Sequence, residues 1–189
     1  MGLHIAGEPA ADALLDENPF ALLVAMLLDQ QFPMERAFAG PARIVERFGD
    51  LDPAAVAAAD PQEFADLCAR TPAVHRYPGS MAGRIQALAA HVVSEYGGDA
   101  GALWRDAASG LELLARVRTL PGFGAQKAAI FVALLGKRLG VRPEGWREAA
   151  GAYGEDGSFR SVADVVGPES LARVRAFKQE QKAAAKAQR

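Results

Sequence analysis

The stretch Leu120–Ala128, which reads LPGFGAQKA, marks a tight turn between two helices. Apolar side chains recur at helical spacing on both sides of it, in residues 111–120 (LELLARVRTL) and 125–135 (AQKAAIFVALL). The proline ends the first helix, and the two glycines allow backbone angles that a residue with a Cβ resists. The sequence therefore predicts a helical hairpin.

This hairpin predicts a site for a phosphate group. Free backbone N–H groups at the start of the second helix favour an anion, and without side chains at Gly122 and Gly124 a sugar-phosphate backbone can come close. This turn resembles the helix-hairpin-helix motif of DNA repair proteins, which implies contacts to DNA through Pro121, Gly122, Phe123, Gly124, Gln126 and Lys127. The alternative is an ordinary helical hairpin that turns at a Pro–Gly pair.

Composition favours an all-α fold. Half of the 189 residues are apolar, which is enough for a sizeable core in one domain or one domain with two lobes. Alanine is abundant, and no alternating run rich in valine, isoleucine and threonine exceeds a few residues.

The charge is unevenly distributed, although the net charge is only −2. Residues 1–70 contain twelve acidic and four basic side chains, whereas residues 113–147 contain seven basic side chains and one acidic side chain, Glu144. A local positive field around the hairpin is expected to attract phosphates. The alternative is that some of these charges only solvate helix faces.

The single cysteine, Cys68, excludes an intramolecular disulfide and a four-cysteine metal or iron–sulfur site in this chain. The histidines show no spacing that indicates a metal site. The apolar run 20–28 is too short to cross a bilayer, and the N-terminus lacks the pattern of a secretion signal. We expect a cytoplasmic, nucleoid-associated protein without a membrane partner.

The order of predicted elements extends the pattern beyond the hairpin. A strongly apolar helix begins at Pro19 and ends in Gln30–Gln31, short helices follow at Asp52–Pro53 and Asp60–Pro61, and the LPGxG turn comes next. Over about Pro19 to Tyr153 this resembles the helix-hairpin-helix (HhH-GPD) superfamily of DNA glycosylases, which includes endonuclease III, the adenine glycosylase and the 3-methyladenine glycosylases.

The resemblance implies an all-α protein of two lobes with a cleft that holds an extruded nucleotide. One lobe is expected to comprise residues 20–136 with the hairpin at 111–136, and the other residues 1–19 together with 137–189. The implied function is base excision DNA repair by a monomer on double-stranded DNA. Two alternatives are a catalytically silent DNA-binding module and, less favoured, a helical protein-interaction domain.

The resemblance also points to a catalytic acid. In the family an aspartate follows the hairpin, and a count without gaps from Pro121 reaches Glu144. A carboxylate there stabilises the positive charge that develops on the deoxyribose as the N-glycosidic bond breaks, and it can deprotonate water. Glutamate is one methylene longer, which places its oxygens about 1 Å further out. The alternative is an acid that only favours the macrodipole of a helix start.

Strand-cleaving members of the family use a lysine two residues after the second hairpin glycine, where this chain has Gln126. Lys127 follows, turned by about 100° on a helix. We therefore expect a monofunctional glycosylase without efficient lyase activity; a shifted alignment would make Lys127 the nucleophile. The absence of cysteines after Cys68 indicates the branch of the family without an iron–sulfur cluster. We expect no cofactor other than a monovalent cation that the hairpin could bind.

A glycosylase must extrude its target base and fill the gap. The family uses a residue at the end of an early core helix, which Gln30 or Gln31 matches; alternatively these amides cap the helix. Candidates for the base pocket are Tyr77, Trp146 and the carboxylate of Asp29. Each has a plain alternative, respectively a loop anchor, a core side chain and a common helix-end acid.

Overall fold

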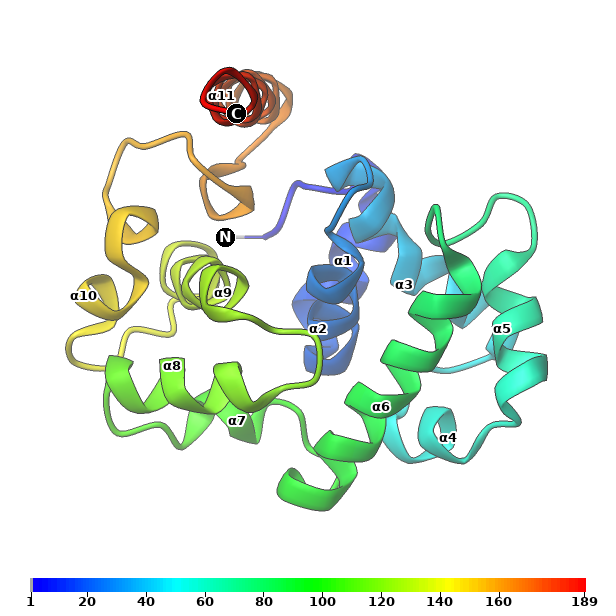
Figure 1. The fold of residues 1–189 in the computed structure, drawn as a ribbon. Helices are drawn as coiled ribbons and strands as arrows, with labels where there is room; N and C mark the ends of the chain where they lie inside the picture. Colours follow the sequence, from blue (N-terminus) through cyan, green and yellow to red (C-terminus); the bar gives the residue numbers. More distant parts are fainter. Residues whose placement is uncertain (1) are drawn as a thin grey trace.

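The computed structural model describes residues 2–189, and over this range the chain is all-α with no β-sheet, as predicted (Figure 1). None of these helices is long and apolar enough to span a membrane. The elements in chain order are α1 (Pro9–Glu17), α2 (Pro19–Leu28), α3 (Met34–Phe48), α4 (Pro53–Ala58), α5 (Pro61–Ala69), α6 (Pro78–Tyr96), α7 (Ala102–Arg105), α8 (Gly110–Thr119), α9 (Ala125–Arg138), α10 (Trp146–Ala150), the 3₁₀ helices η1 (Gly151–Gly154) and η2 (Val162–Asp164), and α11 (Pro168–Ala187).

Polar side chains before a first-turn proline start several of the helices. Asn18 Oδ1 accepts the amide protons of Phe20 and Ala21 at the start of α2, at 3.0 and 3.1 Å. The carboxylates of Asp52 and Asp60 do the same for α4 and α5. Each cap satisfies backbone donors that the first turn leaves free, which confirms these predicted helix starts.

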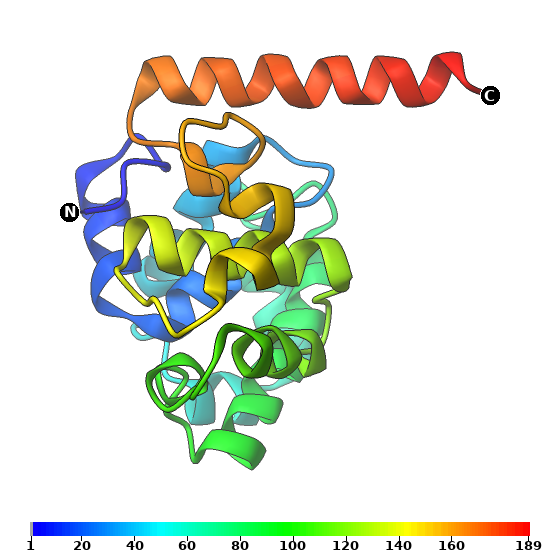
Figure 2. The same cartoon turned by 90° about the vertical axis from the view of Figure 1, so that its left-hand side faces the viewer.

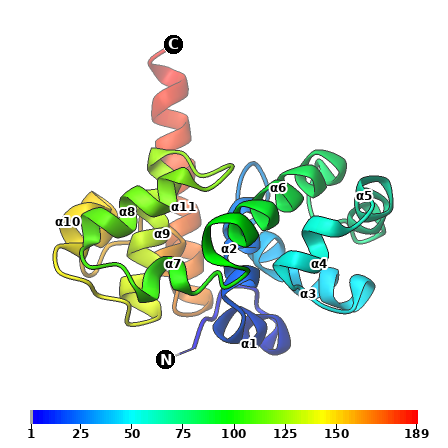
Figure 3. The ribbon, with the colours of Figure 1, turned by 90° about the horizontal axis from the view of Figure 1, so that it is seen from below.

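Helix α2 is the centre of the fold, because every residue from Phe20 to Leu28 is buried. It packs against α1, α3 and α6. Helices α3 to α6 lie on one side of it, and α7 to α10 lie on the other (Figure 3).

The hairpin helices α8 and α9 pack against α10, and α9 also packs against η1 and η2. A lobe boundary at residue 136 therefore does not separate the hairpin from the residues that follow it. Two glycines permit this close packing: a Cβ at Gly110 would lie 2.5 Å from the backbone of Trp146, and a Cβ at Gly136 would lie 2.3 Å from its ring. The expected lobe of residues 1–19 with 137–189 includes Met1, which lies outside the described residues.

The long helix α11 lies across the molecule, and its C-terminal half extends past the other elements on the side of the hairpin turn (Figures 2 and 3). The helix continues to Ala187, two residues before the end of the described chain. Alanine has the highest helix propensity, and three alanines in a row sustain the last turns. Every residue from Lys178 to Ala187 is exposed.

Candidate nucleic-acid interface

The hairpin turn leaves the first amides of α9 open at the surface. Gly122 has φ +85°, in the left-handed region that favours glycine, and Gly124 is the extended residue before α9. A Cβ at Gly124 would meet no atom within 4 Å, whereas one at Gly122 would lie 2.4 Å from Leu27 Cδ1. Gly122 therefore lets the turn pack on the end of α2, and Gly124 faces open space.

Two other residues of the turn are less accessible than the sequence predicts. The side chain of Phe123 is buried, with its ring edge against Phe131 at a centroid distance of 6.0 Å. Pro121 is half-buried. Phe123 can therefore contact DNA only through its main chain, because its side chain belongs to the core.

Lys127 ties the hairpin to the end of α2. Its Nζ donates to the carbonyl oxygens of Met26 at 2.6 Å, Leu27 at 3.3 Å and Asp29 at 3.4 Å. The last carbonyls of a helix lack partners within the helix, and a cation is favoured there. Burial lowers the pKa of Lys127 to about 8, although the nearby Asp29 carboxylate opposes this change.

Asp29 places a carboxylate beside Lys127, and Asp29, Gln30 and Lys127 together form what we call the Asp29 cluster. The Asp29 side chain is 9% exposed, and Oδ2 lies 3.9 Å from Nζ of Lys178 on α11. Burial raises the pKa of Asp29 from its ordinary value, and the positive charges of Lys178 and Lys127 only partly oppose this. Titratable groups with strongly shifted pKa values collect at functional sites, which makes the Asp29 cluster the leading candidate for the functional site.

Gln30 and Gln31 follow directly, and the structure distinguishes between them. Gln30 Nε2 donates to the Leu27 carbonyl oxygen at 2.8 Å, and its Oε1 accepts from Arg84 at 3.2 Å. The exposed side chain of Gln31 makes no hydrogen bond within residues 2–189. Its φ of +51° is in the left-handed region, which costs free energy in a residue with a side chain. Gln30 is thus held in place by hydrogen bonds, whereas the side chain of Gln31 is exposed and makes none within residues 2–189.

His75 fixes this loop from the opposite side. Its Nε2 donates to the Gln30 carbonyl oxygen at 2.8 Å, and its Nδ1 accepts the amide proton of Tyr77 at 3.0 Å. The bond that Nδ1 accepts requires the neutral ring, and burial lowers the pKa of His75 in the same sense. Tyr77 itself is 47% exposed. Its stacking on a base stays a prediction.

Comparison with known proteins bears on this arrangement. The family model of HhH-GPD superfamily base excision DNA repair proteins matches residues 24–188, which is most of the chain. The chain belongs to the HhH-GPD superfamily. No curated protein and no solved structure matches it. Membership confirms the predicted family and fold, and it identifies a DNA-binding protein of base excision repair.

In this HhH-GPD protein Glu144 lies far from the hairpin turn. Its carbonyl oxygen accepts the amide proton of Gly110, at the start of α8, at 2.7 Å. Helix α8 then runs over ten residues from Gly110 to Thr119 beside the turn, a rise of about 14 Å. Figure 2 shows the α9–α10 loop at the opposite end from the turn. The structure therefore brings Asp29 and Lys127 together but does not bring Glu144 to them.

Trp146 lies at the same distant end and is buried against Gly136, so it is not part of the Asp29 cluster. Gln126 is exposed, and its Nε2 donates to the Tyr153 hydroxyl at 2.9 Å. The side chain that reaches the end of α2 and joins the Asp29 cluster is that of Lys127. A count along the sequence cannot show this, because it depends on which side of the first turn of α9 faces α2.

The positive field expected around the hairpin is weaker than the sequence indicates. Three of its seven basic residues form ion pairs: Arg116 with Glu112, Lys137 with Asp164 and Arg147 with Asp156. All three acidic partners lie outside residues 113–147, so a count within that window misses them. The Lys137–Asp164 pair is buried at 2.6 Å and therefore contributes to structure rather than to DNA attraction.

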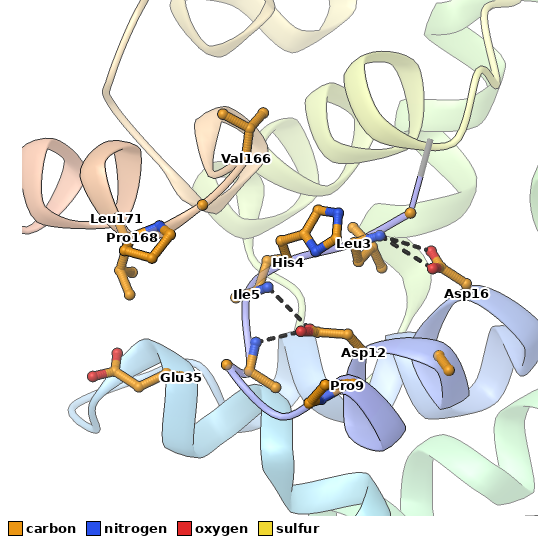
Figure 4. Close-up of a pocket in the computed structure, with 15 residues that line it drawn as sticks. Leu3, His4, Ile5, Pro9, Asp12, Asp16, Glu35, Val166, Pro168 and Leu171 are labelled. Atoms are coloured by element: carbon orange, nitrogen blue, oxygen red, sulfur yellow. Dashed lines mark hydrogen bonds between the residues drawn. The ribbon is translucent and has the colours of Figure 1, made fainter.

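A groove of about 610 Å³ lies elsewhere, between the N-terminal segment, α1 and the start of α11 (Figure 4). Asp12 lies in its wall, and its Oδ1 accepts the amide protons of Ile5 and Ala6 at 3.0 and 2.9 Å. The groove reaches Pro168 and Leu171, about two turns before Lys178. The groove does not include Asp29, Gln30 or Lys127. Residues 2–189 contain no cluster of three or more histidine, cysteine, aspartate and glutamate side chains placed to hold a metal ion.

Proposed function

We propose that this protein is a monofunctional DNA glycosylase that hydrolyses the N-glycosidic bond of a damaged or mispaired base, with Asp29 as its catalytic carboxylate. The observation that carries this proposal is the position of Asp29, buried at the end of α2 beside Gln30 and Lys127, the lysine in the first turn after the hairpin. The ungapped count that favours Glu144 leads to the other end of the hairpin helices.

The proposed chemistry needs one carboxylate close to the sugar. When the bond between C1′ and the base nitrogen breaks, its electron pair leaves with the base and positive charge develops on the sugar. The Asp29 carboxylate stabilises that charge. Water then forms the new bond to C1′, and Asp29 accepts the proton that the water releases. A pKa raised by burial makes Asp29 a stronger base than an exposed aspartate.

Lys127 acts in this proposal as a positioning residue and not as a nucleophile. Its Nζ points at three carbonyl oxygens at the end of α2, and these contacts hold the amine and favour its protonated form, against the burial that lowers its pKa to about 8. Attack on the sugar requires an unprotonated amine with a free lone pair. This supports glycosylase activity without efficient lyase activity.

Gln31 is proposed to fill the gap that the extruded base leaves. It is exposed, makes no hydrogen bond within the described residues and has a strained backbone next to the Asp29 cluster. Gln30 instead positions the loop through Leu27 and Arg84. The amides at the start of α9 are proposed to hold a phosphate, which sets the register of the DNA while the pocket selects the base.

The test is base release from duplexes that contain uracil, hypoxanthine, alkylated purines or oxidised bases, followed by alkali to cleave the abasic product. Asp29→Asn is expected to lower the rate of release about 100-fold or more, because general-base catalysis contributes that much. Loss of release in Glu144→Gln but not in Asp29→Asn would return the catalytic role to Glu144.

Two further outcomes bear on the reaction type. Borohydride treatment during turnover traps the covalent amine adduct of a lyase, and we expect no trapped complex; a complex that disappears in Lys127→Met would assign lyase activity to Lys127. Tight duplex binding without release from any substrate would favour the catalytically silent DNA-binding module.

A further inference from the structure

We propose that the overhanging end of α11 is a second DNA-backbone contact, in which Lys178, Lys182 and Lys186 bind phosphates of the duplex held by the hairpin. The inference rests on the DNA-binding function proposed above and adds a surface to it. Its occupant is the sugar-phosphate backbone of double-stranded DNA.

The three lysines share one face of the helix. At about 100° per residue, Lys182 and Lys186 lie about 40° and 80° around the axis from Lys178. They follow one another every four residues, about 6 Å apart along the axis. The side chains thus form a basic row that an extended line of phosphates matches in charge.

The direction of this face is set by contacts nearer the start of α11. Arg175 pairs with Glu35 of α3, and Lys178 lies 3.9 Å from Asp29. Both residues are within about 60° of each other around the helix. The flank of α11 that meets Glu35 and Asp29 therefore continues past the body as Lys182 and Lys186, while the buried Val174, about 80° and 120° around the axis from these two lysines, faces the body.

The opposite face carries a different charge. Glu169 and Glu180 lie about 180° and 200° around the axis from Lys178. Glu180 is beside the loop of residues 155–160. The exposed end of α11 thus has a basic side, in line with the contacts to Glu35 and Asp29, and an acidic side, in line with residues 155–160.

The overhang is on the same side of the molecule as the hairpin turn, and beyond Glu180 no hydrogen bond or ion pair joins it to another element within residues 2–189. From Lys178 to Ala187 every residue is exposed, over a rise of about 14 Å. Figures 2 and 3 show this end projecting on the same side as the hairpin turn. DNA held at the turn would thus pass in front of the basic row.

The hairpin supplies few free cations, of which the exposed Arg118 at the end of α8 is one. Arg116, Lys137 and Arg147 are paired with acidic side chains, and Lys127 is occupied by the carbonyl groups of α2. Lys182 and Lys186 make no ion pair within the described residues. Their neutralisation of phosphates would release condensed counterions and so contribute to affinity.

The test measures binding of a short fluorescent undamaged duplex by the full chain across a series of salt concentrations. Lys182→Ala/Lys186→Ala is expected to weaken binding and to reduce the slope of log Kd against log salt by about 2, since each phosphate contact contributes about 0.9. Alanine keeps the helix, which circular dichroism can check.

A matched variant moves the two charges to the other side of the same segment. Lys182→Ala/Lys186→Ala/Ala184→Lys/Ala187→Lys keeps the net charge but places it about 240° and 180° from Lys178. We expect this variant to bind as weakly as the double alanine variant. Restored binding would overturn the facing of the row, and an unchanged salt slope in the double variant would overturn the contact itself. Absence of duplex binding by the wild type would instead contradict the proposed function.

Discussion

Lys127 Nζ lies 2.6 Å from the carbonyl oxygen of Met26, so the first turn of α9 closes the last turn of α2. This contact joins residues about one hundred positions apart and fixes the hairpin turn over the central helix. It also buries an amine next to the Asp29 carboxylate, which is why the two groups have opposite pKa shifts. The stability of the fold and the proposed chemistry of the Asp29 cluster therefore both depend on Lys127 and Asp29.

Lys127→Met is expected to destabilise the protein. The substitution removes three hydrogen bonds and leaves carbonyl groups at the end of α2 without a partner, at a cost of about 1–3 kcal/mol. For a chain of this size the melting temperature should fall by roughly 2–10 °C. Calorimetry measures this, with Lys182→Ala as an exposed lysine that should leave the melting temperature unchanged.

The same lysine predicts how stability changes with pH. The pKa of Lys127 is lowered from 10.5 to about 8 in the folded state, so between these values the unfolded chain binds more protons. The free energy of unfolding should therefore gain a contribution as pH rises from about 8 toward 10.5. Urea titrations over this range should show the rise in the wild type and lack it in Lys127→Met. Equal slopes for both proteins would contradict the shift.

Asp29→Asn should stabilise the protein while it abolishes base release. The amide keeps the size of the side chain and removes a charge that is costly to bury, for a gain of about 1 kcal/mol. A carboxyl whose pKa is raised on folding favours the fold at low pH, and that contribution is lost as pH rises through the folded pKa.

The advantage of Asp29→Asn over the wild type should therefore be largest near neutral pH and shrink as the solution is acidified toward 3.8, the ordinary aspartate pKa. Unfolding titrations of both proteins at several pH values test this. A less stable variant at neutral pH would show that the pair with Lys178 outweighs the cost of burial.

Gln31 and Gln30 should respond differently to substitution. Gln31→Gly relieves a positive φ, so stability should stay equal or rise by about 1 kcal/mol, while base release falls because the gap in the DNA is no longer filled. Gln30→Ala loses its bonds to Leu27 and Arg84 and should lower the melting temperature. If Gln31→Gly releases bases at the wild-type rate, the gap is filled by another residue.

Local patterns along the chain predicted most of the fold. The caps at Asn18, Asp52 and Asp60 and the LPGxG turn are features of a few adjacent residues, and the structure confirms them. The sequence did not predict the site as well. The roles of Glu144 and Lys127 depend on where a helix ends in space and which side of it faces a neighbour, and neither depends on local sequence alone.

Gly124→Ala separates the hairpin's role in DNA binding from its role in the fold. The backbone at Gly124 has φ −75° and ψ 180°, which alanine adopts without strain, and an added Cβ would meet no atom within 4 Å. Stability should therefore stay within about 0.5 kcal/mol of the wild type. The new methyl group would stand where a phosphate approaches the amides of α9, so duplex affinity should fall about tenfold, a loss of about 1.4 kcal/mol. Fluorescence polarisation measures the affinity and calorimetry the stability; unchanged affinity in a stable variant would place the DNA away from the turn.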